Sequence, residues 1–380
     1  MSKVRLTFGF VYFGEGKSND DVSGGLFWLQ RFYFTVSLPK CLEMEIVMNT
    51  SNIAGLISGL VPKKMQAIIY DHFGDADVMQ LHEIDVPLPE ENEVLIAVYA
   101  AGVNPIDFRL RSGEGKYVLQ GGFPRVPGYD VSGIIIQSSK NCDLMIGDRV
   151  MAFLDNVRGG GYAQYACCSI SCVAKIPDEM PFEEAAAMPL AGSTALQGIR
   201  DHGHVKGGQK VLINGASGGV GLFAVQIAKA YGAIVTGVAS SENETFVLSL
   251  GADNFIDYEQ SDFTYSENVW NIVFDAAGKS SYWKSRPVLA EDSYYVSTEP
   301  SLQGLATSLV TKLLTKHAEI MLARPDANDL KELIRLYQAK QLRIEIDKLF
   351  SLEQACDAHR RIEDGVERGK IVIQIPRSTN

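Results

Sequence analysis

The run Gly215–Gly221 contains four glycines among seven residues and could bind a phosphate group. It follows the apolar run Gln209–Asn214 and precedes Leu222–Tyr231, which has helical spacing and ends at Gly232. Such a turn lets main-chain N–H groups at a helix start approach a pyrophosphate. A glycine run alone is often only a tight turn, but the flanking strand and helix favour dinucleotide binding. The predicted contact residues are Gly215, Ser217, Gly218, Gly219, Val220 and Gly221.

The end of the second predicted strand, Ala233–Val238, bears on which dinucleotide is bound. NAD-binding folds commonly have a carboxylate at this point, whereas small polar residues with a nearby Arg or Lys suit NADP. Ser240 and Ser241 follow the strand without a carboxylate between, and they favour NADP.

The charges nearby keep NAD open as the alternative cofactor. Glu242 and Glu244 follow the two serines, and the sequence has no Lys or Arg between Lys229 and Lys279. A 2′-phosphate would therefore need a basic partner from elsewhere in the chain. The candidates for that partner are Arg368 and Lys370.

The composition argues against several classes of protein. The 380 residues carry a net charge of -11, which repels phosphate backbones, so nucleic acid is not expected as a partner. No stretch approaches the roughly 20 apolar residues of a membrane-spanning helix. The six cysteines lack the paired spacing of a zinc site and fit a reducing compartment. We therefore expect a cytoplasmic protein without a membrane span.

The spacing of apolar residues changes along the chain. Residues 1–64 mix aromatic residues with Gly and Ser and show no persistent period, so we assign them no function; Met44, Met48 and Met65 offer alternative starts. Short β-branched runs follow, at Met65–Tyr70, Glu93–Tyr99, Val131–Gln137 and Asp148–Phe153. After about Pro189, predicted strands alternate with helices, which is typical of a parallel sheet with crossover helices.

Several motifs occur in one order from Met65 onward. They are Gly102–Gly113, Pro127–Gly133, Gly147–Val150, Gly160–Tyr165, Ala187–Thr194, the glycine turn and Gly369–Val372. Together they resemble the zinc-free members of the medium-chain dehydrogenase/reductase superfamily, in the quinone oxidoreductase (zeta-crystallin-like) group. The resemblance implies an α/β fold with a GroES-like, β-rich catalytic domain at 65–188 and 326–380. A Rossmann domain with a doubly wound parallel sheet is expected between them, at 189–325.

The resemblance also implies roles for residues outside the glycine turn. Thr194 is expected at the nicotinamide end of the cofactor and Tyr258 beside the adenosine phosphate; helix capping for Thr194 and core packing for Tyr258 are the alternatives. The run His317–Leu322 resembles the edge strand by which relatives dimerise, so we expect a homodimer. Substrate choice is expected in 301–316 and in the loop around 113–123.

Two of the motifs bear on a catalytic metal. Where zinc-dependent relatives have a Cys ligand and a His-Glu pair, this sequence has Asn104 and Tyr129-Asp130. Neither an amide nor a phenol replaces a thiolate or an imidazole at zinc, so no metal site is expected. His202 and His204 are a remaining pair, but two ligands beside a glycine are usually incidental.

Without a Lewis acid, hydride removal from an ordinary alcohol is difficult, because nothing stabilises the alkoxide. Quinones and α,β-unsaturated carbonyls accept hydride more readily, since the charge moves to a distant oxygen that a hydrogen bond can stabilise. We therefore predict a reductase of such small electrophilic acceptors. Two alternatives stay open. One is an enoyl-thioester reductase, and the other is a dinucleotide-binding protein with a structural or regulatory role.

Three residues are candidates for contact with the acceptor. Asn104 could donate its amide to a carbonyl or to the nicotinamide ribose, and a turn residue before Pro105 is the alternative interpretation. Tyr117 and Tyr129 could each supply a phenolic proton or be a packed aromatic ring. Asp107 and Arg111 are expected to form a structural ion pair.

Overall fold

The computed structural model describes the backbone of residues 5–9, 32–37 and 43–48, and residues 61–114, 122–138, 143–154 and 159–376 in full. The chain divides into two units, Met1–Pro62 and Lys63–Asn380. In the first unit, three antiparallel strands form a sheet in the order β1-β2-β3. They are β1 (Arg5–Gly9), β2 (Phe32–Ser37) and β3 (Glu43–Met48).

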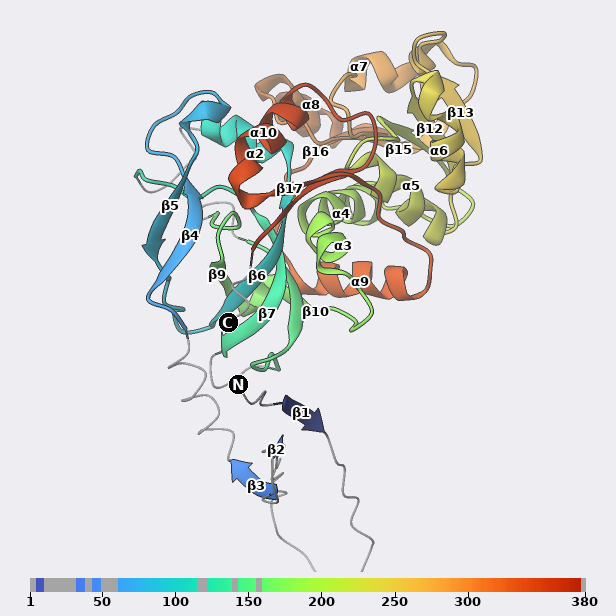
Figure 1. The fold of residues 1–380 in the computed structure, drawn as a ribbon. Coiled ribbons are helices and arrows are strands. Elements are labelled where there is room, and N and C mark those ends of the chain that lie inside the picture. Colours follow the sequence, from blue (N-terminus) through green and yellow to red (C-terminus); the bar gives the residue numbers. More distant parts are fainter. Residues whose placement is uncertain are drawn as a thin grey trace, which may run out of the picture. The chain divides into compact units, whose positions relative to one another are not determined.

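In the second unit, six parallel strands form the sheet that carries the glycine turn (Figure 1). The strands are β11 (Lys210–Asn214), β12 (Ile234–Ala239), β13 (Asn254–Asp257), β14 (Trp270–Asp275), β15 (Leu289–Ser297) and β16 (Lys316–Ile320). Their spatial order is β13-β12-β11-β14-β15-β16, so the sheet starts in the middle and grows first to one side and then to the other. This is the strand order of a Rossmann fold, with its switch point between β11 and β14.

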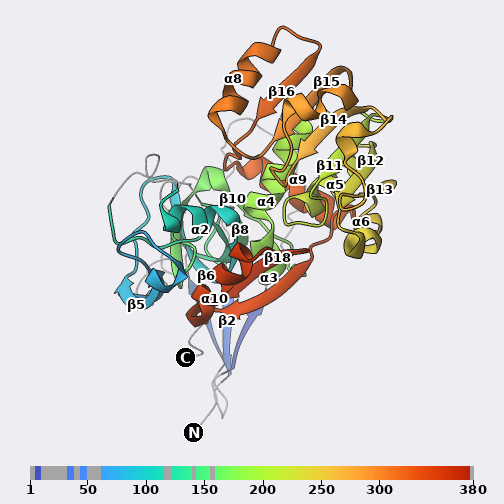
Figure 2. The same cartoon turned by 90° about the horizontal axis from the view of Figure 1, so that it is seen from above.

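The parallel sheet is buried on both faces. Successive side chains of a strand point to opposite faces, so Ile213 and Phe274 join one apolar cluster while Leu212 and Val273 join another. Helices lie on both sides of the sheet (Figure 2). Burial on both faces explains why these strands are continuous apolar runs rather than alternating ones.

A second sheet of seven strands is mixed, and it draws its strands from two distant parts of the sequence. They are β6 (Glu93–Val103), β7 (Asp130–Ser138), β8 (Arg149–Phe153), β9 (Tyr165–Ser169), β10 (Val173–Lys175), β17 (Ile346–Ser351) and β18 (Lys370–Gln374). The order is β10-β8-β7-β6-β18-β17, and β9 also pairs with β6. The last strand, β18, lies antiparallel to β6, with Ile371 opposite Val103. A small antiparallel pair completes the unit, β4 (Lys64–Ile69) with β5 (Gln80–Asp85).

Helices connect and cover the two sheets (Figure 1). They are α2 (Pro105–Ser112), α3 (Phe182–Ala187), α4 (Pro189–Leu196), α5 (Gly221–Ala230), α6 (Glu244–Ser249), α7 (Tyr282–Ser285), α8 (Leu302–Thr311), α9 (Ala327–Gln338) and α10 (Ala355–Glu363). A π-helical turn, η3 (Gln197–His202), continues α4. The short 3₁₀ turns are η1 (Ala76–Val78), η2 (Ile170–Cys172), η4 (Ser241–Asn243), η5 (Phe263–Tyr265), η6 (Arg286–Val288) and η7 (Leu352–Gln354).

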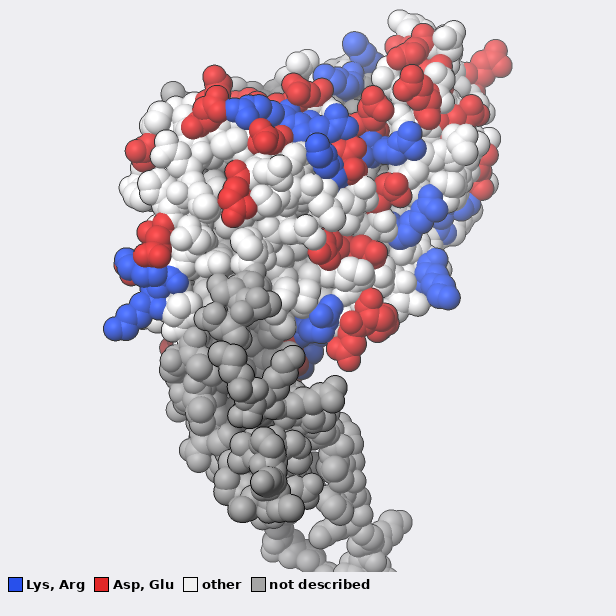
Figure 3. All heavy atoms as spheres, in the orientation of Figure 1, with Lys and Arg blue, Asp and Glu red and all other residues white. Residues whose placement is uncertain are grey.

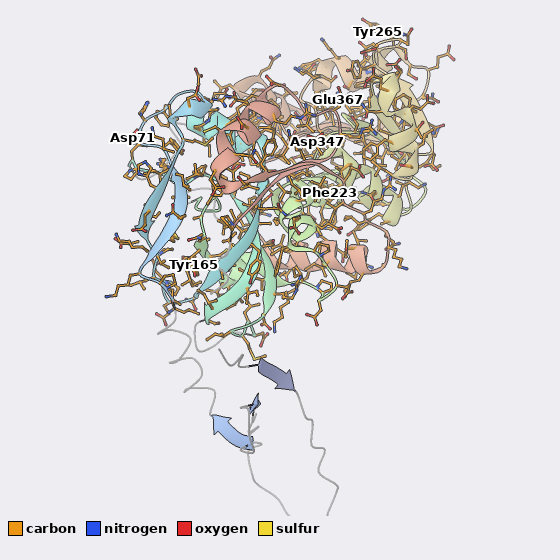
Figure 4. The ribbon with its side chains drawn as sticks, viewed as in Figure 1. Asp71, Tyr165, Phe223, Tyr265, Asp347 and Glu367 are labelled. Carbon is orange, nitrogen blue, oxygen red and sulfur yellow. The ribbon has the colours of Figure 1, made fainter. Side chains whose placement is uncertain are left out.

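The core and the rim of the second unit differ in burial. Phe223 of α5 lies inside the molecule and is fully buried, whereas Tyr265 lies at the outer edge and is 86% exposed (Figure 4). Cys168 and Cys172 are buried in the apolar cluster of the mixed sheet, as small apolar side chains would be. Of the helices that the structure describes, none combines the length and apolar character needed to span a bilayer.

Candidate active site

The turn between β11 and α5 is built on glycines for two separate reasons. Gly215 has a φ of 83°, in the left-handed region that favours glycine. At Gly221, an added Cβ would lie 1.9 Å from the carbonyl oxygen of Gly215, so no side chain fits there. The turn therefore brings the start of α5 close to the end of β11. The N–H of Gly218 donates to the carbonyl of Gly215 and that of Leu222 to the carbonyl of Gly218. The first N–H groups of a helix lack partners within the helix itself and are donors that an anion can use.

The C-terminal strand begins against the glycine turn. The N–H of Gly369 donates to the carbonyl of Ser217 at 3.3 Å. A Cβ at Gly219 would lie 3.1 Å from Cδ of Lys370, so that side chain passes over the turn. Since Lys370 also starts β18 of the mixed sheet, this contact joins the two sheets at the switch point of the parallel one.

The ammonium group of Lys370 lies on the Asn104 side of the turn, where it is 4% exposed. Its Nζ donates to the carbonyl of Val103 at 3.2 Å and to Oδ1 of Asn104. An ammonium group carries three donors, so one hydrogen remains for a further acceptor. The sequence suggested Lys370, beside Arg368, as a candidate partner for a 2′-phosphate; in the structure its ammonium group is directed to Asn104.

Asn104 stands at the N-cap of α2 and is held at both ends of its amide group. Its Oδ1 accepts from Lys370, and its Nδ2 donates to Oδ2 of Asp130 at 2.9 Å. Its backbone N–H donates to Oδ2 of Asp107 at 2.7 Å. Because Asn104 is 1% exposed and one amide hydrogen is already used, the amide is fixed in orientation and keeps a single donor.

Two buried carboxyl groups lie behind Asn104. Burial raises the pKa of Asp107 to about 7 and that of Asp130 to about 6, and the ammonium of Lys370 opposes the shift at Asp130. Burial also lowers the pKa of Lys370, against the attraction of the two carboxyl groups. The three groups therefore form one buried cluster in which protonation of each affects the others.

A tyrosine and a histidine extend this cluster. The hydroxyl of Tyr162 donates to Oδ2 of Asp107 at 3.1 Å and lies 3.3 Å from Nε2 of His359. Burial lowers the pKa of His359 to about 3, so its imidazole is neutral at pH 7. Sequence reasoning missed both residues. Tyr162 belongs to one of the family motifs, but nothing in the sequence around His359 connects it with residues nearly 200 positions away.

The expected ion pair between Asp107 and Arg111 is not formed. Arg111 donates to the carbonyl of Gly74 at 2.8 Å and pairs with Glu363 of α10. Asp107 instead accepts from the N–H of Asn104 and caps the start of α2. The reason is that the carboxyl group of Asp107, in the first turn of α2, accepts a hydrogen bond at the start of that helix. Arg111 is then left to pair with a residue of another helix.

The other predicted residues lie in different surroundings. Thr194 lies inside α4 and donates to the carbonyl of Leu190 at 2.7 Å, so the capping interpretation is wrong. Tyr129 is buried and packs with Leu110 and Phe153, as its aromatic alternative predicted. Tyr117 lies outside the described residues.

At the far end of the parallel sheet, Ser240 and Ser241 follow β12 as the sequence indicated. Tyr258 follows β13 and is 58% exposed, so the core-packing interpretation is wrong. The guanidinium carbon of Arg368 lies 5.7 Å from the ring centre of Phe246, on α6 just after the serines. Arg368 and Lys370 are the two basic residues considered for a 2′-phosphate, and Arg368 is therefore the one near the segment that follows Ser241.

The carboxyl ends of β14 and β15 add residues that the sequence analysis did not select. Asp275 is fully buried and accepts from Nδ2 of Asn214 at 2.8 Å and from the hydroxyl of Tyr295 at 2.9 Å. Nη1 of Arg109 donates to Oε2 of Glu299 at 2.9 Å, linking α2 to the segment after β15. A pocket of about 220 Å³ lies beside Glu299, and Ser301 and Thr307 are in its wall.

The two histidines considered for a metal have separate surroundings. Nδ1 of His202 lies 3.5 Å from the carboxylate of Glu319, while His204 packs edge-on against Tyr294. Within the described residues, no three His, Cys, Asp or Glu side chains come together as a metal site requires.

Comparisons with known proteins identify the family. Residues 90–178 match the alcohol dehydrogenase GroES-like domain, and residues 250–373 match the family described as zinc-binding dehydrogenase. A chloroplast envelope quinone oxidoreductase homolog of Arabidopsis thaliana is 31% identical over 325 residues, which are 82% of this chain and 99% of that protein. The chain belongs to the quinone oxidoreductase group of the medium-chain dehydrogenase/reductase superfamily. The family and the fold class expected from the sequence are thereby confirmed.

Two further comparisons bear on the quinone oxidoreductase group. An NADPH-dependent alkenal/one oxidoreductase of Arabidopsis thaliana is 32% identical over 330 residues, 82% of this chain and 80% of that protein. The structure of the quinone oxidoreductase from Coxiella burnetii has a TM-score of 0.77 and 34% identity, and it covers 83% of this chain and all of that one.

The buried carboxyl groups predict a pH dependence of stability. Since the pKa values of Asp107 and Asp130 are raised above the usual 3.8, the folded chain holds these protons more tightly than the unfolded chain. Their contribution to the free energy of unfolding is complete below about pH 4 and is lost as the pH rises through about 7. Wild type should therefore lose stability over this interval relative to Asp107→Asn, measured by urea unfolding at several pH values. The exposed Asp85→Asn is the control, and parallel profiles for wild type and Asp107→Asn would contradict the assignment.

Proposed function

We propose that this enzyme transfers hydride from NADPH to a quinone or an α,β-unsaturated carbonyl, without a catalytic zinc ion. The observation that carries the proposal is the glycine turn at the start of α5, with Lys370 and Asn104 directly beside it. The names of the similar proteins support the acceptor class, since they include quinone oxidoreductases and an alkenal/one oxidoreductase. Where zinc-dependent relatives have zinc ligands, this chain has Asn104 and Tyr129. An amide and a phenol do not replace a thiolate and an imidazole, which supports the absence of a catalytic zinc ion.

The residues of the turn fit a dinucleotide. Gly219 leaves the space that a Cβ would fill beside Lys370, and the helix start presents N–H groups to an anion. Acidic and basic side chains are interspersed on the face drawn in Figure 3. Because the net charge of -11 repels an anion, the protein depends on local groups to bind a diphosphate.

We assign the diphosphate to the main chain of the turn and the nicotinamide end to the side of Asn104 and Thr194. The residues assigned to the diphosphate are Gly215, Ser217, Gly218, Gly219, Val220 and Gly221. The adenosine end is assigned to Ser240, Ser241 and Tyr258, which follow neighbouring strands of the parallel sheet. The free hydrogen of the Lys370 ammonium is available to the nicotinamide ribose or to a phosphate oxygen.

A bound reduced nicotinamide supplies the hydride, and the chain supplies binding and orientation. The amide of Asn104 is fixed between Lys370 and Asp130, and we assign to it the orientation of the nicotinamide end of the cofactor. We assign the proton that completes the reduction to Tyr117 or Tyr129, or to water. Tyr129 is buried, and its ring packs against Leu110 and Phe153.

The activity is tested by the loss of reduced-nicotinamide absorbance with a panel of quinones, enones and crotonyl-type thioesters. We expect turnover of quinones or enones that persists in EDTA, because no step uses a metal. In Gly219→Val, the added side chain meets Lys370 and the diphosphate, so NADPH affinity should fall at least about tenfold. Faster turnover of thioesters would favour an enoyl-thioester reductase. Cofactor binding without turnover of any acceptor would favour a structural or regulatory role.

We infer a preference for NADP over NAD from Ser240, Ser241 and the nearby Arg368. Arg368→Ala should weaken NADPH binding about tenfold, the effect of one charge-assisted hydrogen bond, and leave NADH binding unchanged. The matched control is Arg361→Ala, since Arg361 is paired with Asp347. Calorimetric titrations measure the four affinities. Equal losses for both cofactors would remove Arg368 from the 2′-phosphate site.

We propose that two chains associate through β16, the edge strand of the parallel sheet, whose outer side has no partner strand within the described residues. An unpaired edge is a template for another strand, and a two-fold axis would join two sheets into one. Light scattering should give twice the chain mass of 41.6 kDa. A mass of one chain at micromolar concentration would contradict this proposal.

We keep the domain assignment as a proposal, with the GroES-like domain at 65–188 and 326–380 and the Rossmann domain at 189–325. It is supported by the return of β17 and β18 to the sheet of β6. We also propose the cytoplasm as the compartment, since the four described cysteines are free thiols. Chloroplast proteins among the similar sequences make the chloroplast the alternative.

A further inference from the structure

An ion pair joins α2 to the segment that follows β15. Nη1 of Arg109, in the last turn of α2, donates to both carboxylate oxygens of Glu299, at 2.9 and 3.2 Å. Glu299 is held from two sides. Its N–H donates to Oγ of Ser297 at 3.2 Å, and a Cβ at Gly278 would lie 3.1 Å from Cβ of Glu299. The side chain of Glu299 therefore packs on the loop that follows β14, and its carboxylate reaches α2.

A second carboxylate approaches the same guanidinium group. Oε2 of Glu114 lies 3.8 Å from Nε of Arg109, and the N–H of Glu114 donates to the carbonyl of Arg109 at 2.9 Å. The side chains of Arg109, Glu114 and Glu299 are 37%, 63% and 45% exposed, so all three charges are in contact with water. We call these three residues the Arg109 cluster. With one positive and two negative side chains, the cluster has a net charge of -1 at pH 7.

The Arg109 cluster lies at the end of the site to which we assign the nicotinamide. Asn104 begins α2 beside the glycine turn, and Arg109 belongs to the same short helix. The strands β14 and β15 lie on one side of the switch point, and β12, with the serines assigned to the adenosine end, lies on the other. A dinucleotide on this fold extends across the switch point, so its nicotinamide half and the acceptor belong to the side of β14 and Glu299.

The described wall of the pocket beside Glu299 contains no cation. The volume of this pocket is about 220 Å³, and Glu299 is the one charged residue among the described residues that line it. Hydroxyl and amide groups provide other polar positions of the wall, among them those of Ser280, Ser301 and Gln303. An anionic substituent of an acceptor would therefore meet a carboxylate without a compensating positive charge, whereas an uncharged carbonyl can accept from the hydroxyl groups.

We propose that the Arg109 cluster is a specificity determinant that favours uncharged quinones and enones over those that carry a carboxylate or sulfonate group. The inference rests on the proposed function and narrows its substrate class. Half-exposed ion pairs contribute little to the stability of a fold, so stability alone does not explain two carboxylates around one guanidinium group. Glu114 also stands at the start of the loop around 113–123, where the sequence predicts substrate choice.

The test changes the net charge of the Arg109 cluster in unit steps from the wild-type value of -1. Arg109→Gln gives -2, Glu299→Gln gives 0, and the double variant Glu114→Gln/Glu299→Gln gives +1. For each protein, kcat/KM is measured with naphthoquinone and with naphthoquinone sulfonate, at saturating NADPH and low salt. The ratio of the sulfonate value to the naphthoquinone value should rise about threefold for each unit of positive charge, and high salt should reduce the differences. The intrinsic reactivities of the two quinones cancel, because each ratio is compared with that of wild type.

The matched control is Asp253→Asn. Asp253 pairs with Lys229 at 2.8 Å, and their side chains, 39% and 33% exposed, are about as accessible as those of Glu299 and Arg109. Asp253 directly precedes β13, so it lies at the amino end of a parallel strand, whereas the site lies at the carboxyl ends. This variant changes the charge of the whole protein by the same unit as Glu299→Gln and should keep the wild-type ratio.

Thermal unfolding followed by circular dichroism shows that each variant is folded. Equal ratios in all variants, with turnover of both quinones, would overturn this inference and leave the proposed function intact. A ratio that rises equally in Asp253→Asn and Glu299→Gln would also overturn it, because the effect would then belong to the overall charge of the protein. No turnover of either quinone by wild type would contradict the proposed function, and the inference with it.

Discussion

The contact between Gly369-Lys370 and the glycine turn holds the site together. The turn belongs to the parallel sheet, whereas Lys370 begins the strand β18 that pairs with β6 of the mixed sheet. Asn104 follows directly after β6, so the same contact places its amide beside the turn. If this contact were lost, the two sheets would no longer hold Asn104 and Lys370 beside the glycine turn.

The electrostatics of the site follow from this arrangement. Lys370 is buried, and a buried ammonium group needs partners of opposite charge or several acceptors. Asp130 and Asp107 supply the charge, and the carbonyl of Val103 with Oδ1 of Asn104 supplies the acceptors. The ammonium is therefore kept next to a turn where an anion is expected, in a protein whose net charge is negative. A single fixed cation and the N–H groups of a helix start can bind an anion locally, although the overall charge of the protein repels it.

Local patterns in the sequence predicted the fold well. The strand, glycine turn and helix at 209–232 appear in the structure within one residue of the expected bounds, because both strand and helix are buried and strongly patterned. The second strand of the unit, expected at 233–238, lies at Ile234–Ala239. The site was less predictable. Asn104 and Lys370 are 266 positions apart, and no local pattern shows that their side chains meet. The failed ion pair of Arg111 has the same origin, since its partner Glu363 comes from α10.

The central claim is that main-chain N–H groups at the start of α5 bind the diphosphate of the cofactor. It is tested most directly by the amide resonances of Gly219, Val220 and Gly221 in the ¹⁵N-labelled chain, recorded before and after the addition of NADPH. The account predicts that these amide protons move downfield on binding, as they do when N–H groups donate to an anion. Binding of NADPH that leaves these three resonances in place would contradict it.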